Sequence, residues 1–223
     1  MLIIRNIKLA STWKCVEQIV EIFLVLYFLL KKRSVGINRK EHTLGTVEPI
    51  REIKDIRRIE KYLAKQSARN LLLFTLGINC GLRISDILSL NIEDVKGKNF
   101  IQITEKKTGK FKKFPINAKL KPMFIKFTKG KANDEPLFMS RQGNRMERTA
   151  AYRVINKACK SIGMEGLIGT HTLRKTFGYH HYQKFKDVVI LQKIFNHSTP
   201  EVTLRYNGIE EDEIFESYEN FIL

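Results

Sequence analysis

Two strand-like segments lie between stretches of helical periodicity, and this order limits the folds open to the chain. Residues 99–104 (NFIQIT) and 110–116 (KFKKFPI) alternate apolar and polar side chains, which is typical of half-buried strands. The EKKTG segment between them contains Gly109 and predicts a tight turn. The sequence therefore predicts a mainly α-helical protein with one small antiparallel β-sheet, an α+β fold.

Helical periodicity covers most of the remaining sequence. Residues 50–65 predict an amphipathic helix whose apolar positions are Ile50, Ile53, Ile56, Ile59 and Leu63. Residues 68–90 predict a buried helix that breaks at Gly81 and resumes as a short second helix. Further helices are expected at residues 118–127, 147–162, 170–185, 187–195 and 199–206.

The chain divides into three regions by composition. We expect residues 1–48 to form an apolar helix and a linker, residues 49–208 to form the main domain, and residues 209–223 to form a separate C-terminal helix. The last region carries six acidic residues and no basic residue. Its apolar residues lie at helical spacing, which predicts an amphipathic helix that covers its own domain or a partner: Ile214, Tyr218, Phe221 and Ile222.

The most apolar window, Ile22–Leu30, does not have the length of a membrane span. It holds nine residues, whereas a bilayer needs about 20. Basic residues follow the window, which is the reverse of a secretory signal. We expect a helix that packs on this protein or on a partner, and no membrane partner; attachment to a membrane surface is the alternative.

The charge of the chain favours a polyanionic partner. The formal net charge is +17, and the acidic tail leaves the rest more positive still. From Lys106 to Lys131 there are ten lysines and no acidic residue, a density suited to a DNA backbone or to a solvated lysine face. The three cysteines lie far apart, which indicates a reducing, cytoplasmic location and no metal site.

Four short segments carry the functional information: GLRISDILSL (81–90), KKTGK (106–110), HTLR (171–174) and HSTPEVTLRY (197–206). Each is weak alone, but in this order they resemble the catalytic domain of the tyrosine recombinases, also called the phage integrase family. The resemblance runs from about residue 46 to the C-terminus. Many members have Asp where this chain has Thr172, a departure beside the reacting groups that leaves the chemistry intact.

The resemblance implies a site-specific DNA recombinase that cleaves and rejoins strands through a covalent 3′-phosphotyrosine, without a metal ion or other cofactor. Tyr206, nine residues after His197, would be the nucleophile. Arg83 and Arg174 would hold the non-bridging phosphate oxygens, because two guanidinium forks can stabilise a pentacoordinate phosphate.

The remaining roles also follow from the resemblance. Lys107 in the predicted hairpin would protonate the departing 5′ oxygen, with simple phosphate contact as the alternative. His171 would accept the tyrosine proton, and His197 would hydrogen-bond the phosphate. Asp86, one helical turn after Arg83, would orient the cluster or be a carboxylate on the helix surface. The lysines expected to contact the DNA backbone are Lys106, Lys110, Lys112, Lys113 and Lys175.

The implied partner is double-stranded DNA, bound by a homo-oligomer, a dimer or tetramer, in which the acidic tail docks on a neighbouring subunit. Typical members carry a helical core-binding domain before the catalytic domain, and the first 45 residues do not look like one. Two alternatives therefore stay open: a non-catalytic DNA-binding regulator, and a truncated mobile-element integrase without productive synapsis. A type IB topoisomerase shares the chemistry but fits the motif spacing less well.

Overall fold

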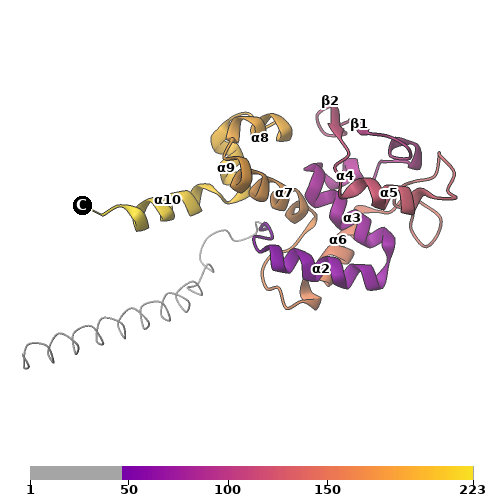
Figure 1. Ribbon diagram of the computed structural model, residues 1–223, viewed down its shortest axis with the longest axis horizontal. Helices are drawn as coiled ribbons and strands as arrows, with labels where there is room; N and C mark the ends of the chain where they lie inside the picture. Colours follow the sequence, from indigo (N-terminus) through magenta and orange to yellow (C-terminus); the bar gives the residue numbers. More distant parts are fainter. Residues whose placement is uncertain (1–46, 223) are drawn as a thin grey trace, which may run out of the picture. The chain divides into compact units, whose positions relative to one another are not determined.

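The structure, a computed structural model, describes residues 47–222. The apolar window Ile22–Leu30 lies outside the described residues, so the expectations for it stay predictions. In chain order the elements are α2 (Ile53–Gln66), α3 (Ala68–Cys80), α4 (Ile84–Ile87), the short 3-10 helix η1 (Ile92–Asp94), β1 (Phe100–Thr104), β2 (Phe111–Pro115), α5 (Leu120–Thr128), α6 (Arg148–Ser161), α7 (Thr170–Phe185), α8 (Val188–Phe195), α9 (Pro200–Asn207) and α10 (Glu210–Asn220) (Figure 1). The mainly helical α+β fold is confirmed.

The small sheet is the predicted hairpin. Strands β1 and β2 pair antiparallel, with Phe100 opposite Pro115 and Thr104 opposite Phe111. Side chains alternate across a strand, so Ile101 and Ile103 turn toward the core while their neighbours are more exposed. One face of the hairpin therefore packs on the domain. Residues 105–110 form the turn that joins the two strands.

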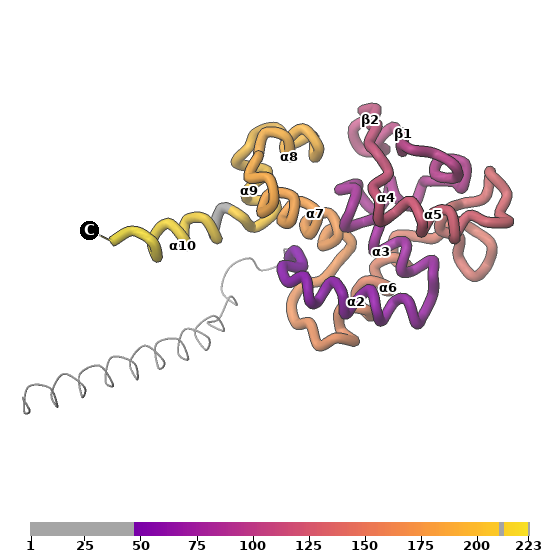
Figure 2. Tube along the Cα trace, in the orientation of Figure 1, coloured from indigo at the N-terminus to yellow at the C-terminus, as the bar shows by residue number. Residues whose placement is uncertain are grey.

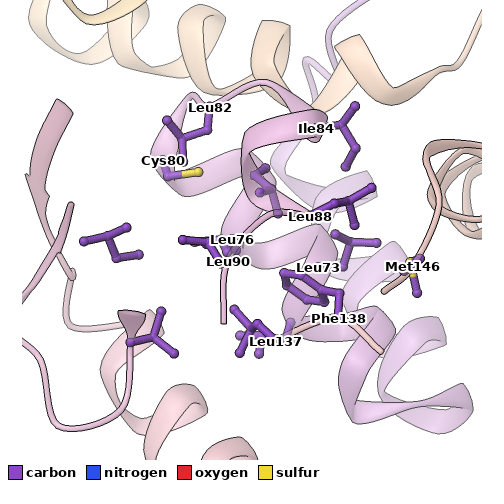
Figure 3. Packing of buried hydrophobic residues seen from close by; sticks show 14 of the residues in the cluster. Leu73, Leu76, Cys80, Leu82, Ile84, Leu88, Leu90, Leu137, Phe138 and Met146 are labelled. Atoms are coloured by element: carbon purple, nitrogen blue, oxygen red, sulfur yellow. The ribbon is translucent and has the colours of Figure 1, made fainter. Parts of the chain in front are cut away.

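Helix α3 is the centre of the domain. It packs against α2, α5 and α7, and its apolar residues are buried around most of its circumference, as expected for a helix without a polar face. Together with α4, β1 and α5 it forms one apolar cluster that includes Leu73, Leu76, Leu88 and Phe138 (Figure 3). The prediction of a buried helix that breaks at Gly81 agrees with this arrangement.

A second apolar cluster joins α2, α3, α6 and α7. Helix α2 contributes Ile56, Ile59 and Leu63, as its periodicity predicts. Ile53, expected on the same face, is 49% exposed, so that part of the prediction is wrong. Ile53 is the first residue of α2, and the chain before the helix covers the core there instead, through Ile50.

The C-terminal helices α7, α8 and α9 pack on one another around a third apolar cluster that contains Tyr182, Leu191, Phe195 and Ile209. Figure 2 shows the trace of these helices, in orange to yellow, following α6. Helix α8 ends at Asn196 and α9 begins at Pro200 after the Thr199 cap, so the two helices meet at a sharp turn. His197 lies in this turn, and Tyr206 lies in the last turn of α9, where its hydroxyl contacts His171 of α7.

Gly178 allows α7 and α9 to approach each other. A Cβ atom at this position would lie 2.1 Å from Oδ1 of the buried Asn207 and 2.8 Å from the Phe195 ring. We therefore expect Gly178→Ala to destabilise the fold by about 1–3 kcal/mol through overpacking. A loss of stability would indicate close packing at this position, because replacing Gly by Ala in an open helix stabilises a protein by roughly 0.5–1 kcal/mol.

Urea denaturation measures the free energy of unfolding of Gly178→Ala. Adding Asn207→Ala to this variant should recover part of the lost stability, because it removes the side chain nearest to the new Cβ atom. An unchanged or higher free energy of unfolding for Gly178→Ala would contradict the close packing of α7 on α9.

Candidate active site

The turn at Gly81, which leaves no room for a larger residue, determines the position of Arg83. Gly81 ends α3 in the left-handed region, at φ 62°, and a Cβ atom there would lie 2.7 Å from the Phe177 ring. Leu82 then enters the core and Arg83 becomes the N-cap of α4. This local geometry turns the guanidinium of Arg83 away from the core and toward the C-terminal helices.

Arg174 lies in α7 and is almost fully buried, with 2% exposure. Its Nη1 donates to the carbonyl oxygen of Gly81 at 2.5 Å and its Nη2 to that of Phe195 at 2.8 Å. The guanidinium also lies 4.3 Å from the centre of the Phe195 ring. Arg174 therefore ties the turn before Arg83 to the end of α8, and burial, followed by the nearby charge of Arg83, lowers its pKa.

Tyr206 lies beside both of the histidines predicted to be catalytic. The Nδ1 atom of His171 lies 3.2 Å from the Tyr206 hydroxyl, and the His197 ring stands edge-on to the Tyr206 ring with centroids 5.0 Å apart. Burial raises the pKa of Tyr206, although Arg174 and Arg83 oppose this effect. The phenol therefore keeps its proton at neutral pH and needs a base before it can attack.

The surroundings of both histidines lower their pKa, which favours the neutral rings. Burial lowers the pKa of His171, and Arg148 and Arg174 lower it further, so Nδ1 can accept the proton of Tyr206. Burial and the charge of Arg174 lower the pKa of His197 to about 4. Its Nδ1 lies 3.1 Å from the hydroxyl oxygen of Thr203, which leaves the other ring nitrogen for a ligand.

The predicted catalytic residues thus fall into two groups. One group converges where α7 and α9 meet the turn before α4: Arg83, His171, Arg174, His197 and Tyr206. Lys107 stands apart from this group, exposed in the turn of the hairpin. Its role as the general acid stays a prediction.

The lysines expected to bind DNA differ in their exposure. Lys106, Lys110 and Lys113 are exposed on the hairpin, and Lys113 lies over the Phe100 ring. Lys175 is buried, with its Nζ 5.2 Å from the centre of the Tyr206 ring. Lys112 is turned inward, with 15% of its side chain exposed. DNA contact by these side chains stays a prediction.

Asp86 is part of the support for the hairpin. It is only 1% exposed, so the alternative of a surface carboxylate is wrong. Its Oδ1 accepts a hydrogen bond of 3.0 Å from the backbone N–H of Lys106, at the start of the turn. Asp86 therefore connects α4, which follows Arg83, to the turn that carries Lys107. Thr172, the departure from the family pattern, accepts the N–H of Gly169 and closes the first turn of α7.

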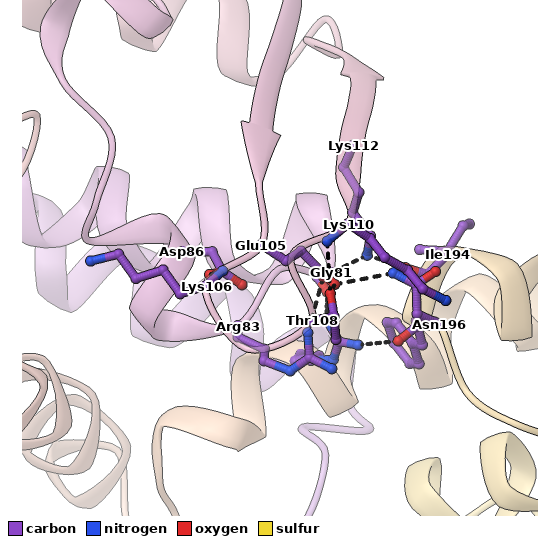
Figure 4. Close-up of polar contacts among 12 residues, drawn as sticks. Gly81, Arg83, Asp86, Glu105, Lys106, Thr108, Lys110, Lys112, Ile194 and Asn196 are labelled. Atoms are coloured by element: carbon purple, nitrogen blue, oxygen red, sulfur yellow. Dashed lines mark hydrogen bonds and ion pairs between the residues drawn. The ribbon is translucent and has the colours of Figure 1, made fainter.

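One residue of the site was not predicted. Glu105 is fully buried, and its carboxylate lies 3.1 Å from Arg83 Nη1 and 2.8 Å from Lys112 Nζ (Figure 4). Its other oxygen accepts hydrogen bonds from Thr108 at 2.7 Å and from Asn196 at 3.1 Å. A sequence signal existed: Glu105 continues the inward alternation of Ile101 and Ile103 and directly precedes the lysine-rich stretch.

Comparison with known proteins gives the same assignment as the motifs. Residues 51–213 match the phage integrase family. The chain belongs to this family. It is 46% identical over 176 residues to the probable integrase/recombinase YoeC of Bacillus subtilis, covering 78% of this chain and 97% of YoeC. It is 26% identical over 196 residues to the tyrosine recombinase XerC of Thermodesulfovibrio yellowstonii, covering 83% of this chain and 64% of XerC.

Solved structures agree on the fold. The crystal structure of XerA recombinase superposes with a TM-score of 0.63 at 19% identity, over 82% of this chain and 67% of XerA. The predicted resemblance to the tyrosine recombinase catalytic domain is confirmed, and the predicted enzyme class, a tyrosine-type site-specific recombinase, is confirmed at the level of the family.

Membrane-spanning helices and metal-binding clusters are absent from residues 47–222 of this phage integrase relative. No helix in that part of the chain is long and apolar enough to cross a bilayer. Within the same residues, no three His, Cys, Asp or Glu side chains are placed to hold a metal ion. The cytoplasmic location and the absence of a cofactor from the reaction stay predictions.

Proposed function

We propose that this phage integrase relative is a site-specific DNA recombinase that cleaves and rejoins DNA strands through a covalent 3′-phosphotyrosine at Tyr206. The observation that carries the proposal is the contact of 3.2 Å between the Tyr206 hydroxyl and Nδ1 of His171, beside the two arginines. A nucleophile, its base and two guanidinium groups are the parts that phosphoryl transfer without a metal requires.

The reaction follows from these positions. The Tyr206 oxygen attacks the scissile phosphorus, and its proton passes to His171. The bond between phosphorus and the 5′ oxygen breaks, and that oxygen takes a proton from Lys107. Arg83 and Arg174 stabilise the charge on the non-bridging oxygens, and the remaining ring nitrogen of His197 hydrogen-bonds one of them when it carries a proton. Attack of a 5′ hydroxyl on the phosphotyrosine reverses every step and rejoins the strand.

DNA is the proposed substrate for two reasons. The lysines of the hairpin and of the following segment form a cationic stretch without an acidic residue, next to the proposed acid. The relatives also include a probable integrase/recombinase, YoeC, of which this chain covers 97%. We therefore propose that a catalytic domain of this length acts as a recombinase, with DNA as its substrate.

The test uses a pool of nicked duplexes with randomised core sequences. The nick lets the short 3′ fragment diffuse away after cleavage, so a phosphotyrosine adduct accumulates and can be isolated on a denaturing gel and sequenced. We expect wild-type protein to form an adduct linked to a 3′ phosphate. Binding to the pool without any adduct would favour the non-catalytic DNA-binding regulator instead.

The tail is proposed to join subunits on DNA. Helix α10 contacts the body through its first turns, where Asp212 pairs with Arg51 and Glu213 accepts a hydrogen bond of 2.5 Å from Tyr182. Beyond Glu213 its large apolar side chains are exposed: Ile214, Phe215, Tyr218, Phe221 and Ile222. An apolar stripe with acidic neighbours suits a basic partner surface, and a second copy of this chain offers one.

Truncation after Glu213 tests this proposal without removing the buried Ile209 or the two anchoring contacts. We expect paired-site complexes to be lost while binding to a single site is kept, as measured by native gel electrophoresis on one-site and two-site duplexes. Equal losses in both assays would count against docking in trans.

A further inference from the structure

Glu105 makes hydrogen bonds that close the turn carrying Lys107. The N–H of Glu105 donates to the carbonyl oxygen of Lys110 at 2.9 Å, and the N–H of Gly109 donates to the carbonyl oxygen of Glu105 at 2.8 Å. The Thr108 hydroxyl adds a hydrogen bond of 2.7 Å to the Glu105 side chain. Glu105 therefore fixes the backbone on both sides of Lys107.

The same side chain reaches across the site. Its Oε1 faces Arg83 and Lys112, and its Oε2 accepts from Asn196, the residue that ends α8. Lys112 extends the connection by donating to the carbonyl oxygen of Ile194 at 2.5 Å. One carboxylate thus joins the hairpin, the start of α4 and the end of α8 (Figure 4).

Glu105 is ionised in this setting. Burial raises the pKa of its carboxyl. The hydrogen bond and charge of Lys112 and the hydrogen bonds from Thr108 and Asn196 outweigh burial and lower the pKa to about 2. A buried carboxylate between two cations is strongly held, because removal of its charge leaves those cations unpaired. The connection between the hairpin and the arginine is therefore a fixed one in this structure.

We propose that Glu105 is a positioning residue that holds the hairpin turn against Arg83 and the end of α8, so that Lys107 reaches the departing 5′ oxygen. This inference rests on the proposed function, because it assigns the hairpin lysine its place in that reaction. Lys107 is exposed, whereas Glu105, two residues earlier, is fully buried and has contacts on three elements.

The test separates proton donation from the rest of the reaction. A duplex with sulfur in place of the bridging 5′ oxygen releases a thiolate, which needs no proton because the pKa of a thiol is about 8.5. We expect Glu105→Gln to cleave the ordinary duplex about 100-fold more slowly than wild type, as loss of a general acid does. The sulfur duplex should restore most of that rate, as it should for Lys107→Ala.

Two further variants serve as controls. Thr108→Val removes one hydrogen bond to Glu105 at an exposed site and should give a smaller loss, also restored by sulfur. Asp94→Asn removes a carboxylate that accepts the N–H of Asn91 in another turn, and it should cleave both duplexes at the wild-type rate. Noncovalent affinity for the duplex, measured by fluorescence anisotropy, should be similar in wild type, Glu105→Gln, Thr108→Val and Asp94→Asn.

A second measurement is independent of cleavage. Hydrogen exchange of the free protein should accelerate at the Lys106 and Gly109 amides in Glu105→Gln, while the amides that pair β1 with β2 keep their protection. This result would support the anchoring role even if wild-type protein formed no adduct, an outcome that would defeat the proposed function alone.

Three outcomes would overturn the inference. The first is an unchanged cleavage rate in Glu105→Gln when wild type cleaves. The second is a loss that sulfur does not restore, which would place the effect on Arg83 or on the fold. The third is faster cleavage or tighter binding in Glu105→Gln, which would mean that the carboxylate repels the phosphate.

Discussion

Tyr206→Phe is expected to abolish the covalent adduct and leave DNA binding unchanged. The phenyl ring keeps the edge-on contacts with Phe195 and His197, so only the attacking oxygen is lost. The nucleophile must lie within reach of its base, and Tyr206 is the phenol that contacts His171. Denaturing gels measure the adduct, and anisotropy measures the affinity for the nicked duplex pool.

Tyr179→Phe is the matched control. Tyr179 is a phenol in α7 whose ring lies under Arg51, and we expect its loss to leave adduct formation intact. An adduct formed by Tyr206→Phe, mapped by mass spectrometry to another tyrosine, would refute the assignment of the nucleophile.

Arg174→Lys is expected to slow cleavage by about 100- to 1,000-fold, the usual cost of removing one preorganised donor from a developing charge. A lysine keeps the positive charge but lacks the fork that reaches both Gly81 and Phe195. One of these carbonyl oxygens would lose its partner, so the free energy of unfolding should also fall, by about 1–3 kcal/mol. Single-turnover cleavage and urea denaturation measure the two effects.

Arg145→Lys separates the two effects. Arg145 also has both arms of its fork occupied, but outside the candidate site: Nη1 donates to the carbonyl oxygens of Leu88 and Leu90, and Nη2 donates to Oδ1 of Asn91. We expect a comparable loss of stability with wild-type cleavage by the folded protein. If both variants cleaved at the wild-type rate, Arg174 would have a structural role only.

The hairpin shows which features the sequence pattern predicted and which it did not. The alternation in residues 99–116 predicted two strands and a turn at Gly109, and both are present. The same residues gave no sign that Lys112 turns inward while Lys110 and Lys113 stay exposed. A lysine in a basic run has no local preference for burial; the carboxylate of Glu105, at the start of the turn, makes that position favourable.

Asp86 and Glu105 show the same limit for acidic residues. Asp86 was found because it follows Arg83 in a recognisable motif, yet its partner, the N–H of Lys106, lies 20 residues away in sequence. Glu105 belongs to none of the four motifs, and its contacts with Arg83 and Asn196 join segments far apart in the chain. Contacts of this kind depend on tertiary packing and have no periodic signature.

Local chemistry in the sequence indicated the candidate reacting groups: a phenol nine residues after a histidine, a histidine three residues before an arginine, and an arginine after a Gly-Leu break. It also determined the helices and the hairpin, since periodicity reflects which face each segment buries. Tertiary structure alone decided that Arg174 joins the turn before Arg83 to the end of α8, and that Glu105 holds the hairpin to both. The reason is physical: a buried charge is stable only where distant segments supply its partners, and those partners exist only once the helices have packed.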